Sequence, residues 1–344
     1  MGAAQRPHHA RHSLLAVLGP HRVLHGPRRL SHLRGAHRGR DRLQLSRDVR
    51  RRVHRVLAAR ARHRARPARA HHAHRTRRHR HPDLRARPAS APTVSLLETT
   101  AITKTFGANR AVDAVDFTVR AGELLALIGS NGAGKTTLVN LISGLLRADE
   151  GTIRFSGKDI TRQTVNQRIR AGIARSFQLV NLFDHLSAFD NVALTIFARQ
   201  GKTRSLTTLA GRDQAVADES MSILKEFGLA PKAPTLAGGL SQGERKLLDV
   251  AIAYALRPTL LFLDEPTSGV STREKAPIMD VVTSIVRSGN ITAVVIEHDM
   301  DIVFRYSDRI VAMHQGAILA DGTPDEIRRN EQVTTTLIGT GETA

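Results

Sequence analysis

The sequence predicts an α/β fold in which a sheet with parallel strands is covered by helices. From about Leu97 onward, short apolar segments alternate with segments of helical period. A glycine-rich stretch, GSNGAGKT, separates one predicted strand from one predicted helix. The composition also changes sharply near residue 93, so the regular pattern belongs to residues 93–344 and not to the first quarter of the chain.

The predicted elements follow one another in an order that supports this class. The expected strands are residues 114–120, 123–129, 152–158, 260–265 and 292–298, and a helix is expected over residues 136–146. Residues 309–322 have the pattern of a hairpin that turns at HQG. A last helix is predicted after it, capped by Thr323 and Glu326 with Pro324 at its first position.

The first 92 residues carry nearly all the net charge of the 344-residue chain. They contain 25 Arg, no Lys and three acids, so 25 positive minus three negative charges gives +22, against +21 for the whole chain. Because the segment has no sustained hydrophobic period and little to bury, we predict that residues 1–92 form a disordered extension. Residues 61–82, ARHRARPARAHHAHRTRRHRHP, have the most extreme composition in the chain.

Two interpretations of this extension remain open. A basic arm would neutralise phosphates on nucleic acid or anionic lipid, but the segment offers no aromatic residue for base stacking. We favour the hypothesis that it is non-native or non-functional, because Lys, Asn, Ile, Phe and Tyr are all absent. GC-rich DNA translated in a wrong frame, or from too early a start, has this composition. The intact mass of the native protein decides: a start near residue 93 supports the hypothesis, and a full-length species contradicts it.

The remaining residues, 93–344, are close to neutral, with 27 basic and 28 acidic side chains. The chain has no cysteine, which excludes disulfides and thiolate chemistry. Its apolar runs are all shorter than the 18 residues that a membrane span needs, so any membrane role is expected to act through a partner.

The stretch from Gly129 to Thr136 matches G-x-x-x-x-G-K-T between a strand and a helix. This context favours a phosphate-binding loop over a glycine loop of another purpose. The glycines let backbone N–H groups surround the phosphates, Lys135 reaches the β and γ phosphates, and Thr136 holds Mg²⁺.

Other polar residues follow predicted strands or begin a predicted helix. Asp264 at a strand end is suited to hold Mg²⁺, and Glu265 is suited to act as a base for the attacking water. Gln178, after ARSF, is a neutral side chain that can contact both metal and water. His298 ends another buried strand, and Ser241 with Glu244 predicts a capping box at a helix start. Each feature alone has a structural explanation, and their order along the chain favours the functional one.

In this order and approximate spacing, the motifs resemble those of the ATP-binding subunits of ABC transporters, over residues 95–340. The resemblance implies a P-loop NTPase core with an antiparallel β subdomain and an α-helical subdomain at about 179–239. It implies ATP and Mg²⁺ as cofactors, with Glu265, His298 and Gln178 as catalytic residues and Thr136, Gln178 and Asp264 at the metal. The residues implied to bind nucleotide are Phe106, which stacks on adenine, and Gly129, Ser130, Asn131, Gly132, Ala133, Gly134, Lys135, Thr136 and Thr137.

The resemblance also implies partners. A second ATPase subunit would present its signature to the ATP of the first, and the signature here is Ser241, Gln242, Gly243 and Glu244. Two ATP molecules would be enclosed in this dimer, and the helical subdomain would dock on membrane permease subunits at the cytoplasmic face of the membrane. An extracytoplasmic solute-binding protein would act indirectly, and no nucleic acid is expected.

Within the family, the chain is most similar to ATPases that import branched-chain or other hydrophobic amino acids. The similar stretches include GIARSFQLVNLFDHLSAFDNV and VVIEHDMDIVFRYSDRI. ATPases of urea import and lipopolysaccharide export look similar, and a soluble ATPase acting on nucleic acid is a further alternative. A non-catalytic regulatory subunit is disfavoured because Lys135, Gln178, Glu265 and His298 are all present.

Three positions, in two segments, depart from the family pattern. Gln242 and Glu244 stand where many members have Gly and Gln, and they leave Ser241 and Gly243 intact. Ser271 stands where most relatives have an Asp that communicates across the dimer. Ser271 with Glu274 predicts a second capping box, but it removes a negative charge.

Overall fold

The computed structural model describes residues 95–176, 182–201, 213–288 and 291–338. The predicted disordered extension, residues 1–92, and Gln178 lie outside the described residues. None of the described helices is both long and apolar enough to cross a membrane.

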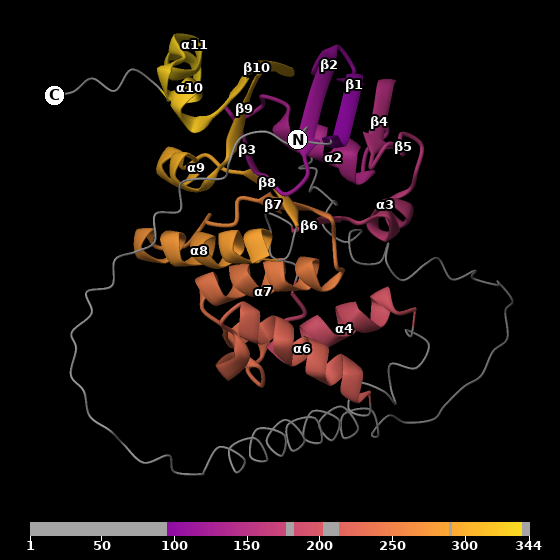
Figure 1. The fold of residues 1–344 in the computed structure, drawn as a ribbon, viewed down its shortest axis with the longest axis vertical. Coiled ribbons are helices and arrows are strands. Elements are labelled where there is room, and N and C mark those ends of the chain that lie inside the picture. The colour runs from indigo at the N-terminus through magenta and orange to yellow at the C-terminus, as the bar shows by residue number, and fades with distance from the viewer. Residues whose placement is uncertain (1–94, 177–181, 202–212, 289–290, 339–344) are drawn as a thin grey trace, which may run out of the picture. The chain divides into compact units, whose positions relative to one another are not determined.

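A six-stranded sheet carries the site and confirms the predicted parallel strands (Figure 1). Its order is β10-β9-β3-β8-β7-β6, and only the β9–β10 pair is antiparallel. Every residue of β7 and β8 is buried, as expected for strands covered on both faces. The strands are β3 (Leu124–Gly129), β6 (Ile173–Arg175), β7 (Leu260–Asp264), β8 (Thr292–Ile296), β9 (Arg309–His314) and β10 (Ala317–Gly322).

A second sheet of four strands is antiparallel, as the family resemblance implied. Its order is β2-β1-β4-β5. The strands are β1 (Ser95–Phe106), β2 (Asn109–Arg120), β4 (Glu150–Phe155) and β5 (Lys158–Asp159).

The helices differ from the sequence prediction in two places, at the end of α2 and at the end of the described chain. The helix predicted over 136–146 is α2 (Lys135–Ser143), because Gly144 adopts a left-handed conformation (φ 82°) and ends it. The helix α10 (Pro324–Arg329) has the predicted cap at Thr323, but it is not the last one, since α11 (Glu331–Val333) and a π-helical turn (Thr334–Ile338) follow. The other α-helices are α3 (Val165–Ala171), α4 (Ala188–Arg199), α6 (Gln214–Glu226), α7 (Gln242–Ala255), α8 (Thr272–Ser288) and α9 (Met300–Tyr306).

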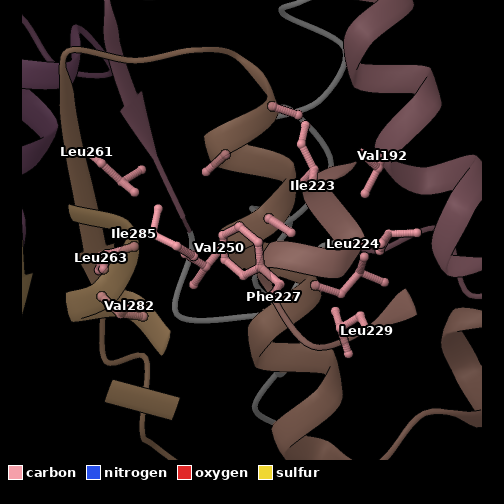
Figure 2. Close-up of a cluster of buried hydrophobic side chains, with 14 of the residues drawn as sticks. Val192, Ile223, Leu224, Phe227, Leu229, Val250, Leu261, Leu263, Val282 and Ile285 are labelled. Atoms are coloured by element: carbon pink, nitrogen blue, oxygen red, sulfur yellow. The ribbon is translucent and has the colours of Figure 1, made fainter. Parts of the chain in front are cut away.

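Alternate residues of the buried strands pack into different cores. Leu261 and Leu263 face a core that they share with α4, α6, α7 and α8 (Figure 2). Leu260 and Phe262 face the opposite core, formed with α2 and the antiparallel sheet. Both faces of the sheet are therefore covered by apolar side chains, which holds its carboxyl edge at a defined place.

The predicted helical subdomain contains α4, α6 and two 3₁₀ turns, Ala230–Lys232 and Ala237–Gly239. Figure 1 shows α4 and α6 on the side of α7 away from the large sheet. The rings of Phe227 and Tyr254 meet edge to face at 5.6 Å between centroids, which joins this region to α7.

Candidate functional site

The glycine-rich loop connects β3 to α2, where the sequence predicted it. Gly129 has φ 152° and Gly134 has φ 99°, and a Cβ at either position would lie 2.4 Å from a backbone oxygen, of Met313 or of Ala111. Only glycine therefore fits these two places. The residues between them, Ser130 to Gly132, are exposed, and Ala133 is buried.

Lys135 lies across this loop. Its Nζ donates to the carbonyl oxygens of Gly129 at 2.6 Å and Ser130 at 3.0 Å. Partial burial lowers the pKa of Lys135, and the negative charges of Glu265 and Asp264 oppose that shift. The structure thus brings the predicted phosphate-binding lysine near the two predicted acids, which follow it by about 130 residues. Thr136 is exposed and Thr137 half-buried in the first turn of α2.

The hairpin turn between β9 and β10 supports the loop. Gly316 donates its N–H to the carbonyl of Ala133 at 3.0 Å, and its own carbonyl accepts from Asp113 at 2.9 Å. The sequence predicted this turn, and the contact with the loop appears only in three dimensions.

Asp264 and Glu265 lie at the carboxyl edge of the sheet, at the end of β7. Asp264 is buried, and its Oδ2 accepts from Arg175 at 2.6 Å. Arg175 also donates to the side chain of Asn140 on α2. The guanidinium of Arg175 therefore joins α2, β6 and β7 at Asp264, the predicted metal ligand. Sequence reasoning missed this role of Arg175, although the residue is part of the segment ARSFQ.

Glu265 has φ 48°, an unusual conformation for a residue with a side chain. Its N–H donates to the carbonyl of Ile296 at 2.9 Å. The nearest oxygen of Glu265 lies 3.9 Å from Nδ1 of His298, too far for a hydrogen bond. The structure therefore brings these two predicted catalytic residues close together without bonding them.

Glu297, next to His298, holds the segment after Glu265. Its buried carboxylate accepts from the N–H of Thr267 at 3.0 Å and from the hydroxyl of Thr267 at 2.7 Å. Sequence reasoning missed Glu297, although a carboxylate directly after a buried strand was a signal that could have identified it.

The signature forms the start of α7. Ser241 caps the helix, and the predicted box is present, with Ser241 N–H to Glu244 at 2.9 Å and Glu244 N–H to Ser241 Oγ at 3.2 Å. The hydrogen bond from the Ser241 N–H, and the ion pair with Lys232, lower the pKa of Glu244. Gln242 is exposed, whereas Gly243 is buried, and a Cβ there would lie 3.2 Å from an oxygen of Glu274.

The second predicted capping box, that of Ser271 and Glu274, is present only in part. Ser271 donates both its N–H and its hydroxyl to Glu274 Oε2, at 3.2 and 2.7 Å, but the N–H of Glu274 bonds to the backbone oxygen of Ser271. The Ser271 hydroxyl therefore acts as a donor and not as the expected acceptor.

Phe106 ends β1 with 48% of its surface exposed. The ammonium of Lys104 lies 5.5 Å from the ring centroid. An apolar ring this exposed is available for stacking, and its contact with adenine stays a prediction.

The donor set fits Mg²⁺ that arrives with a nucleotide. Among the described residues, no group of three or more His, Cys, Asp or Glu side chains could hold a metal. Thr136 and Asp264 would supply one hydroxyl and one carboxylate, and phosphates and water would supply the remaining ligands.

A glycine-rich loop with Lys135 at the edge of a parallel sheet, beside Asp264 and Glu265, defines a nucleotide-binding protein of the P-loop class. Comparison with known proteins specifies the family. The family model described as ABC transporter matches residues 112–268.

Individual relatives agree with this match. The chain is 33% identical over 253 residues to the high-affinity branched-chain amino acid transport ATP-binding protein BraF of Pseudomonas aeruginosa, covering 71% of this chain and 98% of that protein. It is 36% identical over 226 residues to a sulfate/thiosulfate import ATP-binding protein of Shewanella oneidensis, covering 66% of this chain and 61% of that protein. A crystal structure of an ATP-binding cassette of an ABC transporter, in its ADP conformation, matches with a TM-score of 0.65 at 30% identity, over 72% of this chain and all of that one.

The chain therefore belongs to the ABC transporter family and is an ATPase subunit of a transporter.

Proposed function

We propose that this chain powers a membrane importer of branched-chain or other hydrophobic amino acids. The similarity to BraF supports this substrate class because it extends over 98% of that protein. The similarity to the sulfate/thiosulfate protein covers only 61% of the length of that protein. A match confined to the shared ATPase region says less about the transported solute than one that spans a whole subunit.

The nearness of Lys135, Asp264 and Glu265 carries the proposed chemistry. The loop from Gly129 to Thr137 binds the phosphates, and Lys135 neutralises the charge that develops on the γ phosphate. Thr136, Asp264 and Gln178 would hold Mg²⁺, which supplies further charge stabilisation when bound. Glu265 takes the proton of the attacking water, and His298 polarises a phosphate oxygen.

A second ATPase subunit completes the proposed site. The start of α7 presents backbone N–H groups and the positive end of the helix dipole, which suits a phosphate. In the proposed dimer, Ser241 to Glu244 bind the ATP held by the loop of the other subunit. The helical region between residues 179 and 239 docks on the permease, which places the chain peripherally at the cytoplasmic face of the membrane.

Co-purification from native membranes tests the transport proposal. We expect recovery of permease subunits and a solute-binding protein that binds hydrophobic amino acids. Recovery of a sulfate, urea or lipopolysaccharide system instead contradicts the substrate class and retains the ATPase role.

The soluble alternative is tested by removing residues 1–92. We expect the shortened chain to keep its ATPase activity and its permease binding. Loss of an activity that depends on nucleic acid contradicts the importer and supports the alternative.

Phe106→Ala is expected to weaken ATP binding by about 10-fold, since stacking of a base on an aromatic ring contributes about 1–3 kcal/mol. The side chain is half exposed, so the melting temperature should stay the same. Titration with a fluorescent ATP analogue measures the affinity, and Phe183→Ala, at 42% exposure, is the matched control. An unchanged affinity contradicts the stacking role.

Ser271→Asp is expected to change the cooperativity of ATP hydrolysis while activity is retained. The new carboxylate would lie against Glu274, which now accepts from the Ser271 hydroxyl, and would return a negative charge to this loop. The Hill coefficient and the ATP consumed per solute transported are the quantities to measure, with Ser271→Asn as the uncharged control. If neither quantity changes, Ser271 has no role in coupling between subunits.

A further inference from the structure

Lys246, on the signature helix α7, is a buried cation that the mechanism above does not use. Only 4% of its surface is exposed. Its Nζ donates to the backbone carbonyl of Glu265 and to the hydroxyl of Ser268, both at 3.0 Å. One side chain therefore connects the helix that begins with the signature to the residue proposed as the base.

The carboxylates that face this ammonium belong to several elements. Burial lowers the pKa of Lys246, and the negative charges of Asp249, Glu265, Glu297 and Asp264 oppose the shift. Asp249 lies on the same helix, while the other three follow or end β7 and β8. Lys246 thus supplies positive charge to the acidic edge of the site.

The backbone of Glu265 needs support of this kind. With φ 48°, Glu265 has a strained conformation that persists only when its surroundings hold it. Its N–H is held by Ile296 of β8, and its carbonyl accepts from Lys246 and from the N–H of Ser268 at 3.1 Å. Because the peptide groups on both sides fix the Cα–Cβ direction, they determine where the Glu265 carboxylate points.

We propose that Lys246 is a positioning residue that aims Glu265 and joins it to the signature helix of the same subunit. This inference depends on the proposed role of Glu265 as base. Burying an ammonium is itself unfavourable, so packing alone does not explain a lysine at this position. The charge at this position is explained by the carbonyl and the carboxylates that it holds.

Lys246→Met tests the proposal in the full-length protein. We expect kcat to fall by about 10-fold or more, because a displaced catalytic group loses orientation, while the Kd for ATP measured in EDTA changes less than twofold. The matched control is Arg199→Met, which removes a cation that bonds to Glu219 and to the carbonyl of Ala255, at the other end of α7. This control should lower the melting temperature without lowering kcat.

Two further measurements separate positioning from a structural role. In the Glu265→Gln background, Lys246→Met should cause no additional loss of kcat, since both changes act on one group. If Lys246→Met does not fold, Lys246→Gln, which keeps a shorter and neutral donor, is measured in its place and should show the same loss of kcat at unchanged ATP affinity.

An unchanged kcat in the Lys246 variant overturns the inference, as does a fall in kcat that equals the loss of ATP binding. These outcomes are distinct from failure of the proposed function. If Glu265→Gln retains normal hydrolysis, the base assignment is wrong; if it is inactive while Lys246→Met is normal, only the positioning role is wrong.

Discussion

Replacing Glu265 with Gln is expected to lower kcat by about 100-fold or more, the usual contribution of a general base. An amide has the shape of the carboxylate but cannot accept the proton of the attacking water. Glu265 lies next to Asp264 in the chain, and the negative charges of both acids act on Lys135 of the phosphate loop. Glu265 therefore lies at the phosphate end of the site. ATP binding should persist because the phosphate loop is untouched.

The same variant should strengthen the dimer in the presence of ATP. Without hydrolysis, each ATP stays bound between the loop of one subunit and the signature of the other. Phosphate release measures kcat, and light scattering with and without ATP measures the dimer. Glu226→Gln, on α6, is the control and should behave as the original protein. Normal hydrolysis by Glu265→Gln contradicts the base assignment, and the absence of a dimer with every candidate partner counts against the two-subunit site.

Arg168→Met should lower the free energy of unfolding by about 3–5 kcal/mol, because a buried cation and its hydrogen bonds to four carbonyls are lost. Arg168 is only 2% exposed. Its guanidinium donates to the carbonyls of Leu141 and Ile142, in the last turn of α2, and to those of Thr161 and Gln163. Burial lowers the pKa of Arg168 to about 10, so the side chain is still protonated at neutral pH.

The reason for so large an effect is the position of these carbonyls. The last carbonyls of a helix have no partner within the helix. Here the carbonyl of Leu141 also accepts from the N–H of Gly144 at 3.3 Å, so the loss falls mainly on the carbonyl of Ile142 and on those of Thr161 and Gln163. Urea denaturation measures the change, and Arg170→Met, an exposed arginine in the same helix, should change the free energy by less than about 0.5 kcal/mol. A loss below about 1 kcal/mol for Arg168→Met means that water or rearranged side chains satisfy the carbonyls.

Most of the secondary structure could be predicted because its signals are local. The cap at Ser241 depends on a residue three positions away, and the buried strand of β7 is a run of apolar residues in the sequence. The overlong prediction for α2 has the same origin, since apolar residues continue after Gly144 although the left-handed conformation of that glycine ends the helix. The types of residue at the site were likewise available from the motifs.

The sequence by itself determined the α/β class, the glycine-rich loop between β3 and α2, the cap at Ser241 and the resemblance to ABC ATPases, and it predicted the residues of the site. Only the tertiary structure decided which side chains support them. Arg175 meets Asp264 across 89 positions, and Lys246 on α7 reaches the carbonyl of Glu265, which follows β7. The physical reason is that motifs depend on neighbours within a few residues, whereas these contacts depend on how helices and strands pack on the two faces of one sheet.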